Sequence, residues 1–151
     1  MAGTSRIVRR TFVKVPDKFP AGPRQVKVGF PAGSANVDKA IYNEFGTRGG
    51  ASGGGWGGPI PERPFMRNAA RNNAAKYLKI AADQVIPVLT GKVSLRGFLS
   101  KLGELGKQDI QNEITSLSSP PNSPVTIALK GSSKPLIDTG EMRQSVTWKI
   151  D

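Results

Sequence analysis

The chain has 151 residues, of which 22 are Lys or Arg and 11 are Asp or Glu, so its formal net charge is +11. This length fits one domain, and a hydrophobic content of only 37% predicts a modest core. Neither cysteine nor histidine is present, which excludes disulfides, thiolate metal sites and Ser-His-Asp or Cys-His catalysis, and argues against zinc.

The N-terminal part is expected to form a β ribbon over residues 6–30. Residues 6–15 are rich in β-branched side chains, and residues 24–30 alternate between apolar and polar positions, a pattern typical of strands. The apolar face of the second segment consists of Val26, Val28 and Phe30. Basic side chains occupy the other face, where they would meet solvent or an acidic surface.

A short helix and a glycine-rich loop follow. Apolar residues spaced three and four apart predict a short helix or a turn over 37–45, with Asn36 as its cap and Gly46 as its end. Residues 46–58 are of low complexity and predict a flexible loop. Trp56 within this loop has two open interpretations: a docking residue for a partner, or a side chain that packs on its own domain.

The region 64–118 is expected to be helical. Apolar periodicity predicts one helix over 65–86, ended by Pro87 and Gly91, and a second over 94–117. Gly103 and Gly106 lie in the middle of the second pattern, where glycine costs up to about 1 kcal/mol relative to alanine. We expect a kink or a short break there.

The C-terminal part, residues 125–150, is expected to supply strands. Residues 125–129 and 145–150 each alternate as strands, and 140–143 fit a turn or a short helical turn. The predicted fold class is therefore α+β: a small antiparallel sheet with two long helices packed on it, extended arms and a Gly-rich loop.

The tripeptide Asp138-Thr139-Gly140 matches the catalytic motif of aspartic proteases. Such an enzyme needs two carboxylates that share a proton and a chain segment after the motif that builds the substrate cleft. Only eleven residues follow Gly140, too few for a cleft, so a backbone turn is the favoured interpretation. No phosphate-binding loop or carboxylate pair emerges elsewhere, and we expect no enzyme activity, no cofactor and no metal.

Three blocks, taken together and in order, resemble the tail-completion or neck family of tailed bacteriophages. The first runs over 40–47 (AIYNEFGT) and the second over 60–67 (IPERPFMR). The third spans 120–147, from PPNSP through KPLIDTG to SVT. The N-terminal ribbon and the Gly-rich loop lie outside the resemblance.

The resemblance implies a virion structural protein that forms a ring, usually six-fold, at the neck and joins the tail to the head connector. Expected partners are other copies of the chain, the head-connector protein, and the tail-terminator or tail-tube protein, in the virion and, during assembly, in the host cytoplasm. The motif residues would then be structural: Arg63 and Pro64 would set the start of a helix, Phe65 would lie in the core, and Asp138 with Gly140 would shape a turn. The full set of expected structural residues is Glu44, Gly46, Arg63, Pro64, Phe65, Pro135, Asp138, Thr139 and Gly140.

The positive charge leaves the nature of the partner open. A basic surface can meet DNA in a channel or an acidic neighbouring protein, or simply keep the chain soluble. A basic nucleic-acid-binding module and another connector or tail-terminator ring therefore stay as alternatives. With no signal peptide and no apolar stretch long enough for a membrane span, a soluble protein is expected. The candidate interface residues are Arg9, Arg10, Lys14, Arg24, Lys27, Arg48 and Trp56.

Overall fold

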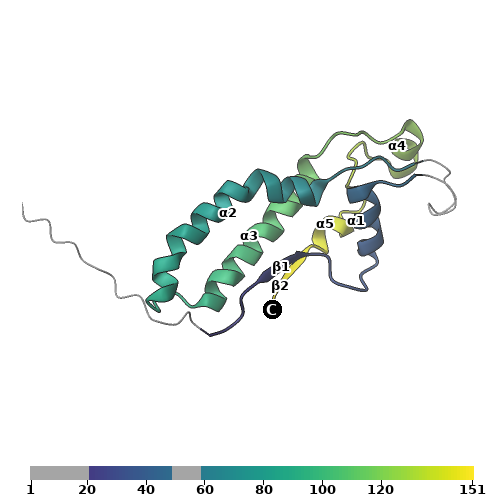
Figure 1. Cartoon of the computed structure of the whole chain (residues 1–151). Helices are drawn as coiled ribbons and strands as arrows, with labels where there is room; N and C mark the ends of the chain where they lie inside the picture. Colours follow the sequence, from purple (N-terminus) through teal and green to yellow (C-terminus); the bar gives the residue numbers. More distant parts are fainter. Residues whose placement is uncertain (1–20, 49–58) are drawn as a thin grey trace, which may run out of the picture.

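The computed structural model describes residues 21–48 and 59–151. Two long antiparallel helices, α2 (Phe65–Leu89) and α3 (Leu95–Ser116), lie side by side and form its frame (Figure 1). The side chains of Lys76 and Tyr77 on α2 both reach Asp109 on α3, with Lys76 Nζ 2.6 Å and Tyr77 Oη 2.5 Å from the same carboxylate oxygen. Burial and this carboxylate together raise the pKa of Tyr77, so the phenol remains the donor.

A two-stranded antiparallel sheet packs on the side of α3 that faces away from α2 (Figure 1). Strand β1 (Val26–Gly29) pairs with β2 (Thr147–Ile150), so that Val28 lies opposite Trp148. Side chains of this pair lie directly over the glycines of α3. A Cβ atom at Gly103 would lie 2.6 Å from Trp148 Cδ2, and one at Gly106 would lie 3.0 Å from Val28 Cγ2.

The core lies at the end of the helix pair where α2 begins and α3 ends. Helix α1 (Asn36–Phe45) and the short α5 (Glu141–Gln144) close this end. Phe65, Ile114 and Val146 are completely or almost completely buried there, and Phe30 meets Phe65 edge to face with ring centroids 6.2 Å apart. The expectation that Phe65 lies in the core is confirmed.

The predicted fold class is confirmed: a small antiparallel sheet and two long helices make an α+β fold. The predicted partner of β1, residues 6–15, lies outside the described residues. Among the described residues, β1 pairs with β2 instead. Basic and apolar residues alternate as expected, with Lys27 exposed and Val28 turned toward the core.

One predicted strand is wrong. Residues 125–129 lie within a helix, α4 (Pro124–Lys130). The Ser123 side chain accepts a hydrogen bond from Thr126 N, Pro124 occupies the first helical turn, and Gly131 ends the helix in the left-handed conformation. These signals at the two ends favour a helix, and they outweigh the β-branched side chains between them.

Two details of the long helices also differ from expectation. Helix α2 continues through Pro87 to Leu89 before Gly91 ends it at φ 72°. Helix α3 is unbroken through Gly103 and Gly106. In α3 the contacts with the sheet offset the low helix propensity of glycine, so the predicted break does not occur.

Candidate functional site

The first two sequence blocks form one hydrogen-bonded joint. Glu44, near the end of α1, is buried, and its carboxylate accepts hydrogen bonds from the backbone N–H groups of Met66 (2.8 Å) and Arg67 (3.1 Å). These N–H groups belong to the first turn of α2, where no residue of the helix itself can bind them. Glu44 therefore caps α2 from a distance of some twenty residues, and a carboxylate also complements the positive end of the helix dipole.

Arg67 holds the Glu44 cap in place. Its Nε lies 2.9 Å from a Glu44 carboxylate oxygen, and its guanidinium also donates to the Glu44 backbone carbonyl and to Glu62. These two carboxylates raise the pKa of Arg67. The guanidinium also lies over the ring of Phe45, 5.2 Å from its centroid.

Gly46 and Thr47 connect the blocks through the backbone. Thr47 N donates to Ile60 O at 2.9 Å, and Ile60 N donates back to the Thr47 hydroxyl at 3.0 Å. Gly46 adopts φ 69°, and a Cβ atom there would lie 2.9 Å from Ile60 O. The glycine is thus required both for its left-handed conformation and for the close approach of the second block.

Arg63 joins the third block to the first two. Its buried guanidinium donates to the carbonyl oxygens of Pro120 (2.9 Å) and Pro121 (3.0 Å) and to the Asn43 side chain (3.2 Å). A fourth, longer bond reaches Asn122 at 3.4 Å. Burial lowers the pKa of Arg63, but an arginine stays charged under all ordinary conditions. Arg63 therefore fixes the Pro120–Asn122 segment against the start of α2.

The rest of the third block folds around the same point. Asn122 donates to the carbonyl of Lys134 at 3.2 Å, and Lys130 Nζ donates to the carbonyls of Lys134 (2.8 Å) and Pro135 (3.3 Å). Burial lowers the pKa of Lys130, an effect that nearby Asp138 partly opposes. These bonds hold α4 to the loop that precedes Leu136.

The Asp138-Thr139-Gly140 turn behaves as a structural element. Gly140 takes φ 84° directly before α5, and the Thr139 hydroxyl accepts a long hydrogen bond, 3.4 Å, from Glu141 N. Asp138 is exposed, and no ion pair or hydrogen bond joins its carboxylate to another side chain or backbone group of residues 21–48 or 59–151. We had expected Asp138 to shape the turn, but its side chain makes no such bond.

A groove opens between α4 and the joint. The larger hollow has a volume of about 970 Å³ and the smaller, beside α1 and α5, about 310 Å³. They share Asn43, Ile60, Lys130, Pro135 and Asp138 as lining, so we treat them as one surface, the terminal groove. Apolar side chains of Ile60, Val125 and Leu129 also line it.

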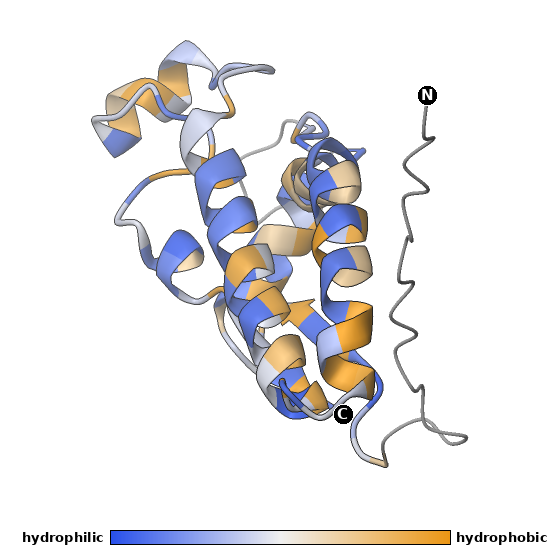
Figure 2. Ribbon diagram, turned by 90° about the vertical axis from the view of Figure 1, so that its left-hand side faces the viewer, coloured by the Kyte–Doolittle hydropathy of each residue, from blue (hydrophilic) through white to orange (hydrophobic). Residues whose placement is uncertain are grey.

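Helix α4 forms the outer wall of the terminal groove and buries none of its residues. Val125 and Leu129 are 65% and 66% exposed. In Figure 2 the apolar residues of α4 stand apart from the two long helices. A seven-residue helix is too short to be stable by itself, so its exposed apolar side chains indicate a surface that is built for contact.

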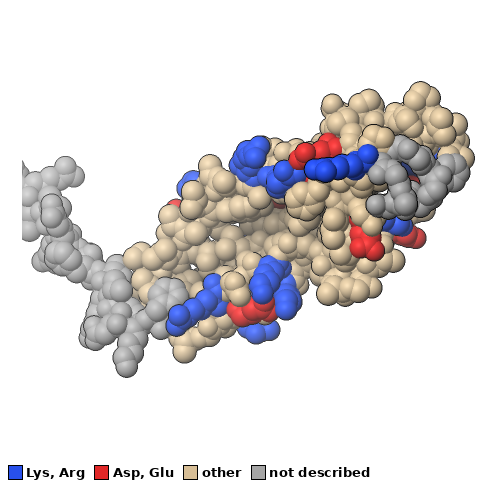
Figure 3. Space-filling model, turned by 45° about the vertical axis from the view of Figure 1, so that its right-hand side comes forward, with Lys and Arg blue, Asp and Glu red and all other residues tan. Residues whose placement is uncertain are grey.

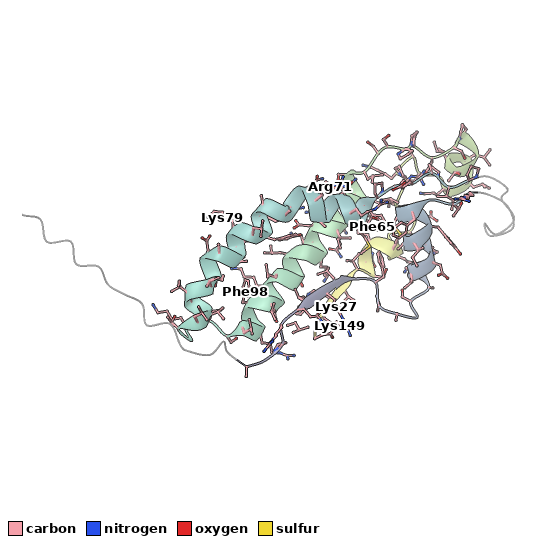
Figure 4. All side chains as sticks on the ribbon, in the orientation of Figure 1. Lys27, Phe65, Arg71, Lys79, Phe98 and Lys149 are labelled. Carbon is pink, nitrogen blue, oxygen red and sulfur yellow. The ribbon has the colours of Figure 1, made fainter. Side chains whose placement is uncertain are left out.

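The candidate basic residues divide into two groups. Arg24, Lys27 and Arg48 are exposed, whereas Arg9, Arg10, Lys14 and Trp56 lie outside the described residues. Lys27 lies opposite Lys149 across the sheet, and both bind the Asp151 carboxylate, at 2.5 and 3.0 Å. Figure 4 shows Lys27 and Lys149 on the outer side of the sheet, and Figure 3 shows that Lys and Arg gather in more than one place on the face that it draws. Lys27 and Lys149 are separate from the joint, whereas Arg48 directly follows Thr47 of the joint.

Sequence reasoning missed Asn43 and Asn122, which position the Arg63 guanidinium. Both lie within the motif blocks, Asn43 in α1 and Asn122 in the loop before α4, but an asparagine carries no sign of a contact across 20 or 59 positions. In the described part of the chain no group of three His, Cys, Asp or Glu side chains could hold a metal ion. None of its helices is long and apolar enough to cross a membrane.

Comparisons with protein-family models, with curated proteins and with solved structures found no match.

Proposed function

We propose that this protein is a structural component of a tailed bacteriophage particle, which forms a ring at the neck, completes the tail and joins it to the head connector. One observation supports the proposal most. The three sequence blocks that resemble the neck family converge on one hydrogen-bonded joint, through Glu44 and Arg63. Blocks that build one joint act as a single folding signature, whereas unrelated chance matches would have no reason to meet.

The architecture is compatible with a role in assembly. The joint uses its charged side chains to hold loops together and offers no paired acid and base for catalysis. The terminal groove and α4, in contrast, leave apolar side chains exposed at one end of the molecule. Exposed apolar surface of this kind is typical of proteins that associate.

Genetic depletion tests the proposal in the virus that encodes the chain. Without the protein, electron microscopy should show filled heads and complete tails that are separate, and supplying the wild-type protein should restore joined particles. An Arg63→Ala protein should fail to restore them, whereas the Lys101→Ala protein, altered at an exposed residue of α3, should succeed. Normal joined particles in the absence of the protein would refute the proposal.

Another connector or tail-terminator ring is the alternative within the same class, and a density map of the assembled neck separates these by position. A nucleic-acid-binding module is the alternative from another class, and the basic group of Lys27 and Lys149 on the sheet favours it. Phosphate contacts would make DNA affinity fall steeply with salt. Binding that is tight at physiological salt and is lost when both lysines become glutamine would support that alternative.

A further inference from the structure

We propose that the terminal groove receives residues 6–15 from a second copy of this chain. The inference rests on the proposed function in one respect only: both require copies of the chain to associate. It follows from the direction of the chain at β1, the charges of the groove and the apolar lining of α4.

Helix α4, which forms the outer wall of the groove, and the start of the described chain lie at opposite ends of the molecule (Figure 1). Arg24 and Gln25 pair with Asp151 at one end of the sheet. From there β1 runs along α3 toward the end where α3 terminates and the groove begins. Helix α3, with 22 residues, separates the two ends by about 33 Å.

Chain length makes binding within one molecule unfavourable. Residue 15 is six residues from Ala21, which allows a reach of about 20 Å, and residue 6 allows about 50 Å. Because the chain enters β1 while heading toward the groove, the preceding segment would have to reverse and follow its own body. The N-terminal half of the segment could then span this distance, but its C-terminal half could not. A neighbouring copy imposes no such limit.

Charge favours the groove as the receiving surface. Residues 6–15 contain Arg6, Arg9, Arg10 and Lys14 and no acidic residue. Two of the three cations that line the groove, Arg63 and Lys130, are already engaged, since they donate to backbone carbonyls, while Lys39 is exposed. Asp138, shared by both hollows, and Glu141, in the smaller one, are exposed, and no hydrogen bond or ion pair joins their carboxylates to another described residue. The outer face of the sheet, by comparison, presents Lys27 and Lys149 and would repel the same segment.

Apolar matching supports the same assignment. The segment carries Ile7, Val8, Phe12, Val13 and Val15 between its basic residues. The groove offers Ile60, Val125 and Leu129. A segment that enters here would cover the exposed apolar side of α4, which nothing within the described chain covers.

Such a contact joins one end of a molecule to the opposite end of the next. It is therefore head-to-tail, and repeated contacts of this kind close into a ring or extend as a filament. A head-to-tail contact through the terminal groove would therefore account for the ring of the proposed function.

Cross-linking of full-length protein tests the inference, because the chain has no native cysteine. One variant carries Thr11→Cys in the N-terminal segment. A second, differently tagged variant carries Thr126→Cys, at an exposed residue that lines the groove, and its thiol is activated before mixing so that only hetero-disulfides form. The matched control replaces Thr126→Cys with Gln108→Cys, at an exposed position on α3 outside the groove.

We expect the Thr126→Cys mixture to give about ten-fold more cross-linked dimer than the Gln108→Cys mixture, because docking raises the local thiol concentration. Adding Leu129→Lys to the groove variant should remove this excess, because it replaces an apolar contact with a charge that repels the basic segment. Ala128→Lys, on the same helix but outside the lining, should leave it. Equal yields at the two positions would overturn the inference. So would a doubly substituted chain that closes only on itself.

The result is independent of the neck assay. If cross-linking fails and depleted particles still separate into heads and tails, only the groove inference is lost. If cross-linking succeeds and depleted particles are normal, the chain self-associates as inferred but acts elsewhere.

Discussion

Arg63 illustrates how one side chain can organise three distant segments. Its guanidinium binds Pro120 and Pro121 carbonyls and the Asn43 side chain, and its own backbone N–H donates to Asn43 O at 2.7 Å. A planar group with five donors suits this arrangement of acceptors, and a lysine ammonium does not reproduce it. The residue therefore acts as a connector between loops as well as the start of a helix.

Replacing Arg63 should destabilise the fold strongly. Arg63→Ala leaves two carbonyl oxygens and a side-chain amide, all partly buried, without their donor, and a fully buried group left so costs about 1–3 kcal/mol. We expect a total loss of about 3 kcal/mol in the free energy of unfolding, measured by urea denaturation. Arg63→Lys should recover only part of this loss, because it restores the charge without the forked geometry. A loss below 1 kcal/mol for Arg63→Ala would contradict this role.

At the scale of single residues, the sequence correctly indicated that Phe65 lies in the core, but it did not reveal which side chain caps α2. Arg63, Pro64 and Phe65 were expected to set the helix start and the core, and Phe65 does lie in the core. The cap of α2, however, comes from Glu44, because Pro64 provides no side-chain hydrogen bond at that end. A cap supplied from another helix depends on tertiary packing, which periodicity and local motifs do not reveal.

Among the elements, α3 depends on its glycines for contact with the sheet. Gly103 is buried and meets the ring of Trp148, whose Nε1 donates to Glu104 at 2.9 Å. This hydrogen bond lowers the pKa of Glu104. The glycines that predicted a break are thus needed because Trp148 and Val28 pack closely on one side of the helix.

Gly103→Ala should lower stability although alanine favours helices. The gain in propensity is about 1 kcal/mol, but a Cβ atom 2.6 Å from Trp148 requires the strand to move, and such overpacking costs about 1–3 kcal/mol. We expect a net loss of about 1–2 kcal/mol in thermal or urea unfolding. In a Trp148→Leu background the same substitution should cost less, and the difference measures the contact. A stabilised Gly103→Ala protein would show that the ring moves freely.

Helix α4 shows where sequence patterns become ambiguous. Five alternating residues, 125–129, fit a strand as well as a short helix, and neither choice buries a side chain within the subunit. The decisive signals stand just outside the pattern, at Ser123, Pro124 and Gly131. The capping residues of this segment are therefore more informative than its alternation, since alternation is informative chiefly where one face is buried.

Hydrogen exchange should separate α4 from the long helices. With no buried residue, α4 should open locally at a cost below about 2 kcal/mol, whereas amides of α3 near Ile110 and Ile114 should approach the global stability. Mass spectrometry of dilute protein measures both. If copies associate through the terminal groove, protection of α4 should rise with protein concentration while protection of α3 changes little. Strong protection of α4 in the isolated subunit would contradict the expected local opening of this helix.

The two ends of the described molecule carry different features. One end holds the core, the joint and the terminal groove, and the other holds the α2–α3 turn and the point where the chain enters β1 (Figure 1). Two ends with different surfaces permit a head-to-tail contact, which closes into a ring or extends as a filament when it is repeated. The sequence resemblance implies a protein that associates into a ring, but the position of the contact surface that we propose depends on the folded arrangement of α4, Ile60 and Asp138.

Association should make thermal stability depend on protein concentration. A partner that binds only the folded state adds about 2.7 kcal/mol at a hundred times its dissociation constant, which for a domain of this size raises Tm by about 5–10 °C. Calorimetry over a hundredfold range of concentration should show this rise for the wild-type protein and for Ala128→Lys. Leu129→Lys should have the same Tm as the wild type in dilute solution, because the Leu129 side chain is exposed, and should show no rise on concentration. A concentration-independent Tm for all three proteins would mean that the exposed apolar side of α4 does not mediate self-association.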